Sequence, residues 1–175
     1  MSLEFTLHTA PTVPVEAESL SVAGLTGLSA TAAARLPVVH GNRAAELGDF
    51  FHVAGVPDGE VHVSGDLSRV KHVGAGMSAG RLVVHGRVGM HLGTRMTGGE
   101  IVVEGDAGDW VGSDMGGGRI VVRGNAGHLV GSAVRGERMG MQGGEILVLG
   151  SAGNEVGGGM RRGLVAIGGD AGDFA

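Results

Sequence analysis

The sequence predicts an all-β fold, a parallel β-helix (solenoid) of about six coils with 19-residue repeats. Three observations predict it: glycines gather in one part of the chain, that part repeats at a fixed interval, and apolar residues alternate with polar ones inside each repeat. Only five of the 37 glycines precede residue 59, and the other 32 lie in the remaining 117 residues. The regularly placed Val, Ile, Leu and Met residues among them argue against a flexible linker.

Each repeat opens with a short segment that begins and ends with glycine. Gly80-Arg-Leu-Val-Val-His-Gly86 is followed by related segments that begin at Gly99, Gly118, Gly144 and Gly163, and a weaker copy begins at Gly59. The step is 19 residues in three of the five intervals, and it lengthens to 26 where an insertion falls at residues 135–141. Six copies predict six coils stacked about 4.8 Å apart.

Inside each copy, apolar and polar residues alternate with the period of a half-buried strand. The inward positions form two columns, Val61, Leu82, Ile101, Ile120, Ile146 and Val165 in the first and Val63, Val84, Val103, Val122, Val148 and Ile167 in the second. Glycines recur between the apolar segments, where a positive φ would let the chain turn a corner. Each repeat is therefore expected to run strand, corner, strand, corner.

The first 58 residues lack this pattern, so we expect residues 1–58 to form an N-terminal capping segment and residues 59–175 the β-helix repeats. An open solenoid end would expose unpaired strand edge and apolar columns. Within the cap, residues 4–8 are predicted as a strand. Residues 29–36 are predicted as one short helix that Ser29 caps and Pro37 ends. Residues 49–55 are predicted as a strand leading into the first coil.

Composition excludes several classes of function. The chain has no cysteine, which rules out disulfides and thiolate-bound zinc or iron–sulfur clusters on this chain. Its net charge of −5 provides no basic footprint for nucleic acid or for an anionic membrane. No signal peptide and no apolar run of about 18 residues is found. We therefore expect a cytoplasmic protein that binds neither nucleic acid nor membrane.

The outward positions contain the residues that could carry chemistry. One column alternates in charge and predicts a surface salt-bridge ladder: Glu60, Arg81, Glu100, Arg119 and Glu145. A second column brings Ser64, His85 and Glu104 onto successive strands, the residue types of a nucleophile triad. That column lies on a flat strand face without a pair of oxyanion donors, so a solvated polar ladder is the better interpretation. The eight histidines form no repeating column and predict no metal site.

A third outward column is aliphatic and predicts a covered surface. It contains Val83, Val102, Val121 and Leu147, and Trp110 and Phe174 add aromatic area at equivalent positions of their repeats. We interpret these six residues as a candidate partner interface, with coverage by residues 1–58 as the alternative. The last repeat stops at Ala175, and we expect a partner or tail-to-tail pairing to cover its edge.

The repeated pattern Gly-Gly-x-Ile-Val-Val-x-Gly-x-Ala-Gly-x-x-Val-Gly-x-x-Met resembles a β-helical domain shared by two families. These are the C subunits of formylmethanofuran dehydrogenase and the C-terminal part of the glutamate synthase large subunit. The segment Leu-Pro-Val-Val-His-Gly-Asn-Arg-Ala-Ala-Glu-Leu-Gly-Asp-Phe-Phe-His-Val-Ala-Gly at residues 36–55 is similar to the entry segment of the C subunits. The resemblance runs from about residue 20 to the end and implies a right-handed parallel β-helix.

This resemblance implies a non-catalytic subunit with no catalytic, cofactor-binding or metal residue of its own. Its partners would be the amidohydrolase-like, formyltransferase and dehydrogenase-like subunits of a one-carbon complex. In the bacterial version, a formyltransferase/hydrolase moves a formyl group from formyl-tetrahydromethanopterin to a methanofuran-like carrier and releases formate. In the archaeal version, formylmethanofuran dehydrogenase reduces CO2 with a tungsten or molybdenum pterin and iron–sulfur clusters. One lysine against twelve arginines favours the bacterial version.

Two other functions stay open at this point. One is an enzyme that uses an outer strand face, as polysaccharide-cleaving β-helices do. Its expected groove of clustered acids and aromatics is not evident, because the chain has only five aromatic residues and its outward acids alternate with arginines. The other is a glutamate-synthase-type β-helix that acts as a spacer, which would be fused to amidotransferase and flavin domains.

Overall fold

The computed structural model describes residues 2–175, and in that range it contains twelve strands, two short α-helices and one 3₁₀-helix. The elements of the first half are β1 (Leu3–Leu7), β2 (Val15–Glu16), α1 (Val22–Leu25), α2 (Ala30–Ala34), β3 (Pro37–His40), β4 (Arg43–Glu46), the 3₁₀-helix η1 (Leu47–Asp49), β5 (Phe51–Gly55), β6 (Glu60–Ser64) and β7 (Val70–Lys71). They are followed by β8 (Arg81–His85), β9 (Glu100–Val103), β10 (Arg119–Val122), β11 (Glu145–Val148) and β12 (Leu164–Ile167).

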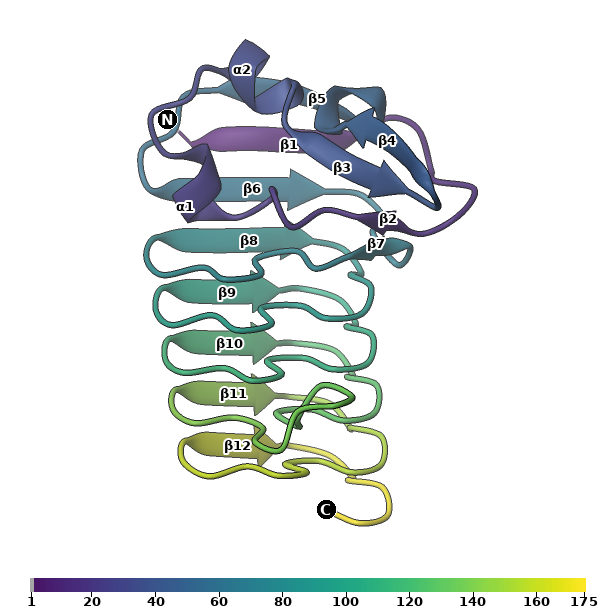
Figure 1. The fold of residues 1–175 in the computed structure, drawn as a ribbon, viewed down its shortest axis with the longest axis vertical. Helices are drawn as coiled ribbons and strands as arrows, with labels where there is room; N and C mark the ends of the chain where they lie inside the picture. The colour runs from purple at the N-terminus through teal and green to yellow at the C-terminus, as the bar shows by residue number, and fades with distance from the viewer. Residues whose placement is uncertain (1) are drawn as a thin grey trace.

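These strands form two sheets. The larger has eight strands in the order β12-β11-β10-β9-β8-β6-β1-β5, and the smaller has four in the order β4-β3-β2-β7. Figure 1 shows the large sheet running the length of the molecule, with the N-terminal elements gathered at one end and the C-terminus at the other. The small sheet lies at the N-terminal end.

The predicted fold class, an all-parallel right-handed β-helix with one helix in its cap, is wrong. Both sheets are mixed: β1 pairs in parallel with β6 but antiparallel with β5, and β2 pairs in parallel with β7 but antiparallel with β3. The prediction failed because strands from the first 58 residues join both sheets and reverse the chain direction. Those residues also form two α-helices where one was expected.

The second strand predicted for each repeat is found in the first repeat, as β7, but not in the later ones. After the later main strands the neighbouring segments form isolated bridges instead of strands, which join Leu67 to Val88, Val88 to Ala107, Ala107 to Ala126 and Ala152 to Ala171. Further backbone hydrogen bonds join successive repeats, as from the amide of Gly112 to the carbonyl of Leu92. The residues that follow the bridges adopt a positive φ, as at His91 and Trp110, and this breaks an extended run. Each step therefore contributes one strand of four or five residues to the large sheet.

The parallel part of the large sheet nevertheless aligns the predicted inward columns. Leu82 pairs with Ile101, Ile101 with Ile120 and Ile120 with Ile146. These four side chains are fully buried. The same holds for four methionines in the connections between successive strands, Met77, Met96, Met115 and Met141. One apolar core therefore extends along the sheet and includes Phe5 and Phe51 near its N-terminal end.

Local signals explain the N-terminal elements. The hydroxyl of Ser29 accepts a hydrogen bond from the amide of Ala32, so the predicted cap of α2 is confirmed. The strands predicted at residues 4–8 and 49–55 are found as β1 and β5. The hairpin β3–β4 turns through Gly41 and Asn42, and φ is +67° at Gly41, a conformation that glycine adopts without a Cβ clash.

Candidate functional site

The aliphatic column of the candidate interface lies on the outer face of the large sheet. Val83, Val102, Val121 and Leu147 are neighbours in register on β8, β9, β10 and β11. Val83 and Val102 are only 5% and 7% exposed, while Val121 and Leu147 are half-buried. Both valines are buried, yet neither belongs to the contiguous apolar cluster of the interior.

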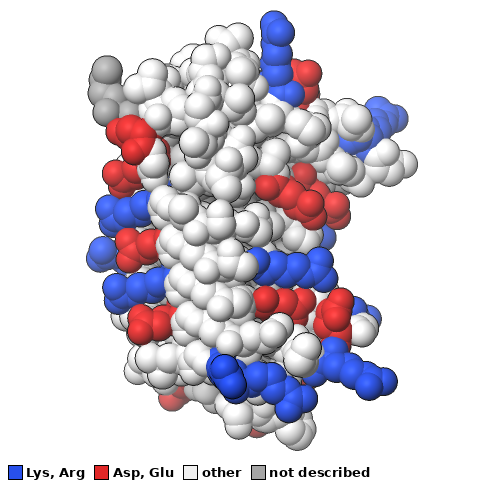
Figure 2. Space-filling view, turned by 60° about the vertical axis from the view of Figure 1, so that its left-hand side comes forward, with Lys and Arg blue, Asp and Glu red and all other residues white. Residues whose placement is uncertain are grey.

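A row of charged side chains flanks this column. Arg81 lies 3.1 Å from Glu60 and 3.0 Å from Glu100, and Arg119 lies 3.8 Å from Glu100 and 3.7 Å from Glu145. The predicted salt-bridge ladder is confirmed, and Figure 2 shows acidic and basic side chains alternating along one border of the molecule. Exposed pairs of this kind stabilise a fold by about 0–1 kcal/mol each, so the ladder contributes little to the stability of the fold.

The three residues of the possible triad are not assembled for catalysis. Nδ1 of His85 lies 3.2 Å from Glu104, but its Nε2 lies 2.8 Å from Nδ1 of His62. Nε2 of His62 in turn lies 3.3 Å from Glu60. His85 therefore faces a second imidazole at the atom that would have to accept a proton from Ser64.

These contacts join Glu60, His62, His85 and Glu104 into one four-residue relay along the outer face. The two rings are stacked, with centroids 5.1 Å apart and planes 7° apart.

A second group of histidines does form a column, contrary to the sequence prediction. His72 stacks on His91 at 4.7 Å between ring centroids, and His91 stacks on Trp110 at 5.1 Å. All three residues have φ near +60°, as do Leu129, Glu155 and Phe174. The constant spacing of 19 residues from His72 to His91 to Trp110 was the signal that could have identified this stack.

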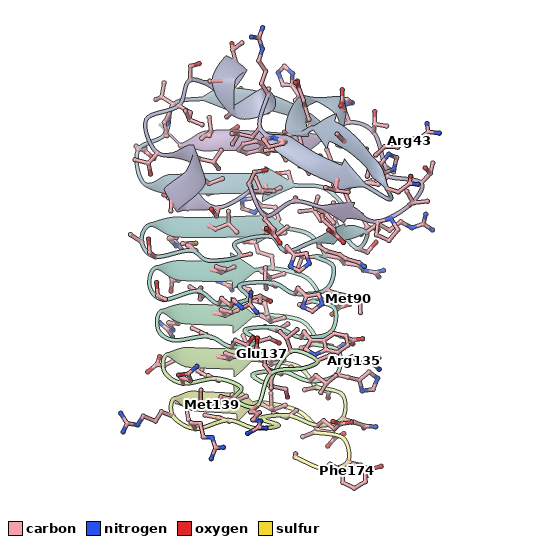
Figure 3. All side chains as sticks on the ribbon, viewed as in Figure 1. Arg43, Met90, Arg135, Glu137, Met139 and Phe174 are labelled. Carbon is pink, nitrogen blue, oxygen red and sulfur yellow. The ribbon has the colours of Figure 1, made fainter. Side chains whose placement is uncertain are left out.

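The two aromatic residues of the candidate interface do not lie in its aliphatic column. Trp110 is half-buried in the stack, and its Nε1 is buried without a partner, as is Nδ1 of His91. Phe174 is 86% exposed at the C-terminal end of the molecule (Figure 3). The six predicted interface residues therefore occupy three places, and whether any of them binds a partner stays a prediction.

Burial lowers the pKa of His91 below its ordinary value. The largest cause is desolvation of the ring, and the nearby His72 and Lys71 act in the same direction. The carboxylates of Asp109 and Glu16 oppose the shift. His91 therefore gains a proton less readily than a histidine in water.

A pocket of about 460 Å³ opens beside this stack, lined by Glu18, His72, Ala75, Gly76, His91, Thr94, Arg95 and Val134. Val134 belongs to the loop between β10 and β11, which also contains the labelled Arg135, Glu137 and Met139 of Figure 3. Arg95 lies 3.6 Å from both Asp114 and Glu137, and the carboxylate of Asp114 accepts a hydrogen bond from the amide of Val134. These contacts hold the loop against the segment that follows β8.

Across residues 2–175 no group of three or more His, Asp or Glu side chains is placed to hold a metal ion. Across the same residues, no helix has the length and apolar character needed to cross a membrane.

Comparison with known proteins identifies relatives of the chain. Over 80 residues it is 45% identical to the C subunit of the molybdenum-containing formylmethanofuran dehydrogenase 1 of Methanothermobacter thermautotrophicus. Over 85 residues it is 42% identical to the C subunit of the tungsten-containing formylmethanofuran dehydrogenase 2 of Methanothermobacter wolfeii. The chain is a homologue of the C subunits of formylmethanofuran dehydrogenase. The resemblance inferred from the repeated pattern is thereby confirmed.

A solved structure extends the likeness over nearly the whole chain. A chain from the crystal structure of the formyltransferase/hydrolase complex of Methylorubrum extorquens, in complex with methylofuran, superposes with a TM-score of 0.90 and 32% identity. The match covers 95% of this chain and 63% of that one. The two curated matches cover 45% and 46% of this chain, but only 20% and 32% of the relatives. No family model matches the sequence.

Proposed function

We propose that this chain is a structural, non-catalytic subunit of a formyltransferase/hydrolase complex. The complex would transfer a formyl group from formyl-tetrahydromethanopterin to a methanofuran-like carrier and release formate. The observation that carries the proposal is the superposition of 95% of the chain on a chain of such a complex at a TM-score of 0.90. The proposed partners are the amidohydrolase-like, formyltransferase and dehydrogenase-like subunits.

The chemistry of the outer face supports a structural role. Its acids face arginines or histidines, and the imidazole of His85 lies between Glu104 and His62. A histidine that acts as a general base needs a free ring nitrogen that can reach the substrate proton. Nε2 of His85 is not free, because it lies against Nδ1 of His62. The reacting groups would therefore come from the other subunits, and this chain would hold them in place.

The curated relatives favour a second candidate, the C subunit of a CO2-reducing formylmethanofuran dehydrogenase. Their names specify molybdenum- or tungsten-containing enzymes, and they match at 42% to 45% identity. The two candidates share the role of this chain and differ in the partners it would assemble. They therefore predict different metals in the purified complex.

Purification of the tagged chain from its native host tests the proposal. The purified material would be analysed for its proteins, for formate release from formyl-tetrahydromethanopterin, and for molybdenum and tungsten. Formate release with formyltransferase and amidohydrolase-like subunits, without either metal, is the expected result. Pterin and iron–sulfur subunits with bound metal would favour the dehydrogenase, and recovery of the chain alone would contradict both candidates.

A further inference from the structure

The outer face of the large sheet changes character at β11 and β12. In the charged row, Arg119 on β10 is in register with Glu145 on β11. The next position in register, on β12, is the uncharged Leu164. On the other side of the aliphatic column, Leu149 follows β11. Leu149 is 58% exposed and Leu164 is 50% exposed, and Leu147 is half-buried between them. We call Leu147, Leu149 and Leu164 the leucine patch.

The exposure of the patch has a local cause. Val83 is 5% exposed and lies between Arg81, which pairs with Glu100, and His85, which contacts Glu104. Leu147 pairs in register with Ala166, whose methyl group covers little area. Of its two outward neighbours along the chain, Glu145 pairs with Arg119, whereas Leu149 cannot form an ion pair. The predicted aliphatic column is thus more exposed in the half that lies near the leucine patch. Neighbouring exposed apolar side chains are typical of a protein–protein contact.

Arginines surround the leucine patch. Arg161 and Arg162 come directly before β12, Arg123 comes directly after β10, and all three side chains are exposed. Within residues 2–175, no carboxylate forms an ion pair with any of these three arginines. Arg119 differs, because Glu100 and Glu145 flank it. The patch is therefore apolar at its centre, and Arg123, Arg161 and Arg162 form its basic rim, while Glu145, in register with Leu164, pairs with Arg119.

We propose that the leucine patch is the docking surface for another subunit of the complex. The subunit that fits would present aliphatic or aromatic side chains within a rim of Asp and Glu, which complements the three arginines. A second copy of this chain fits poorly, because a two-fold contact would place two basic rims against each other. This inference rests on the proposed function and adds to it the surface and the chemistry of the contact.

The test measures binding of the full chain to the other subunits, expressed and purified together without it. The patch variant is Leu149→Asp combined with Leu164→Asp, and the rim variant is Arg161→Glu combined with Arg162→Glu. Val56→Asp and Arg43→Glu are matched controls, since Val56 is 52% exposed and Arg43 is exposed at the N-terminal end of the molecule (Figure 3). Thermal unfolding of each variant verifies that it folds.

The patch variant is expected to weaken binding at least tenfold, as loss of a central apolar anchor does. The rim variant is expected to weaken binding and to reduce its salt dependence. Folded variants that bind as tightly as the wild type would overturn the docking surface and leave the proposed function intact. Failure of the wild-type chain to bind any of the other subunits would overturn both, and a self-associated chain that the patch variant makes monomeric would assign the patch to a second copy.

Discussion

His91 links the stack of rings to the pH dependence of stability. The folded chain binds the His91 proton less readily than the unfolded chain, because burial and nearby cations lower the pKa of the ring. The stability that His91 contributes is therefore present above the unfolded value of about 6.5 and is lost as the pH falls through the lower folded value. The free energy of unfolding should accordingly decrease on acidification below about pH 6.5.

His91→Phe separates this effect from the packing of the stack. A phenyl ring can still lie between His72 and Trp110, but it does not titrate. Denaturant unfolding between pH 5 and pH 8 should show a shallower acid loss for this variant than for the wild type. His52→Phe, at an exposed position of β5, controls for the removal of one histidine. An unchanged acid slope in His91→Phe would contradict the assignment.

The His62–His85 relay gives a second residue-scale prediction. His85→Ala removes the contacts with His62 and Glu104, both at the surface, so the free energy of unfolding should fall by less than about 1 kcal/mol. A catalytic role would instead require loss of an activity with unchanged stability. The measurement is denaturant unfolding alongside formate release by the reconstituted complex, whose rate should stay within twofold of the wild type.

The glycines at the corners of the repeats allow a test of how closely successive repeats stack. A Cβ at Gly117 would meet the backbone carbonyl oxygen of Thr97 at 2.5 Å. A Cβ at the adjacent Gly116 would make only ordinary contacts, with the Thr97 methyl group at 3.7 Å and the Met96 carbonyl oxygen at 3.9 Å. Backbone cannot move aside as a side chain can, so Gly117→Ala should cost about 1–3 kcal/mol of unfolding free energy. Gly116→Ala, the matched control, should stay within about 0.5 kcal/mol of the wild type. Equal denaturation midpoints for the two variants would contradict the close stacking of successive corners.

Element by element, the sequence was most informative where one residue decides the local structure. The hydroxyl of Ser29 predicted the start of α2, and period-two alternation predicted the strands that contain Leu82, Ile101 and Ile120. The Gly41-Asn42 pair between two β-prone segments could have predicted the β3–β4 hairpin. Short α1 could not be predicted with confidence from four residues, because helices of that length depend on tertiary contacts.

For the whole molecule, spacing predicted which strands are neighbours but could not predict the mixed topology. β1 inserts between β5 and β6, a pairing between distant segments that tertiary packing determines. The exposure of individual residues on the outer face could not be predicted from the sequence either. The four aliphatic residues of the outward column looked alike in sequence, yet Val83 and Val102 are buried while Val121 and Leu147 are half-buried.

In the proposed role, this chain would assemble catalytic subunits without contributing a reacting group. The most direct measurement is to express the other subunits of the native complex with and without this chain, and to compare their assembly by light scattering and their rate of formate release. We predict a stable complex of fixed stoichiometry that contains this chain, and loss of assembly or of activity when it is omitted. Full assembly and full activity without the chain would contradict the account.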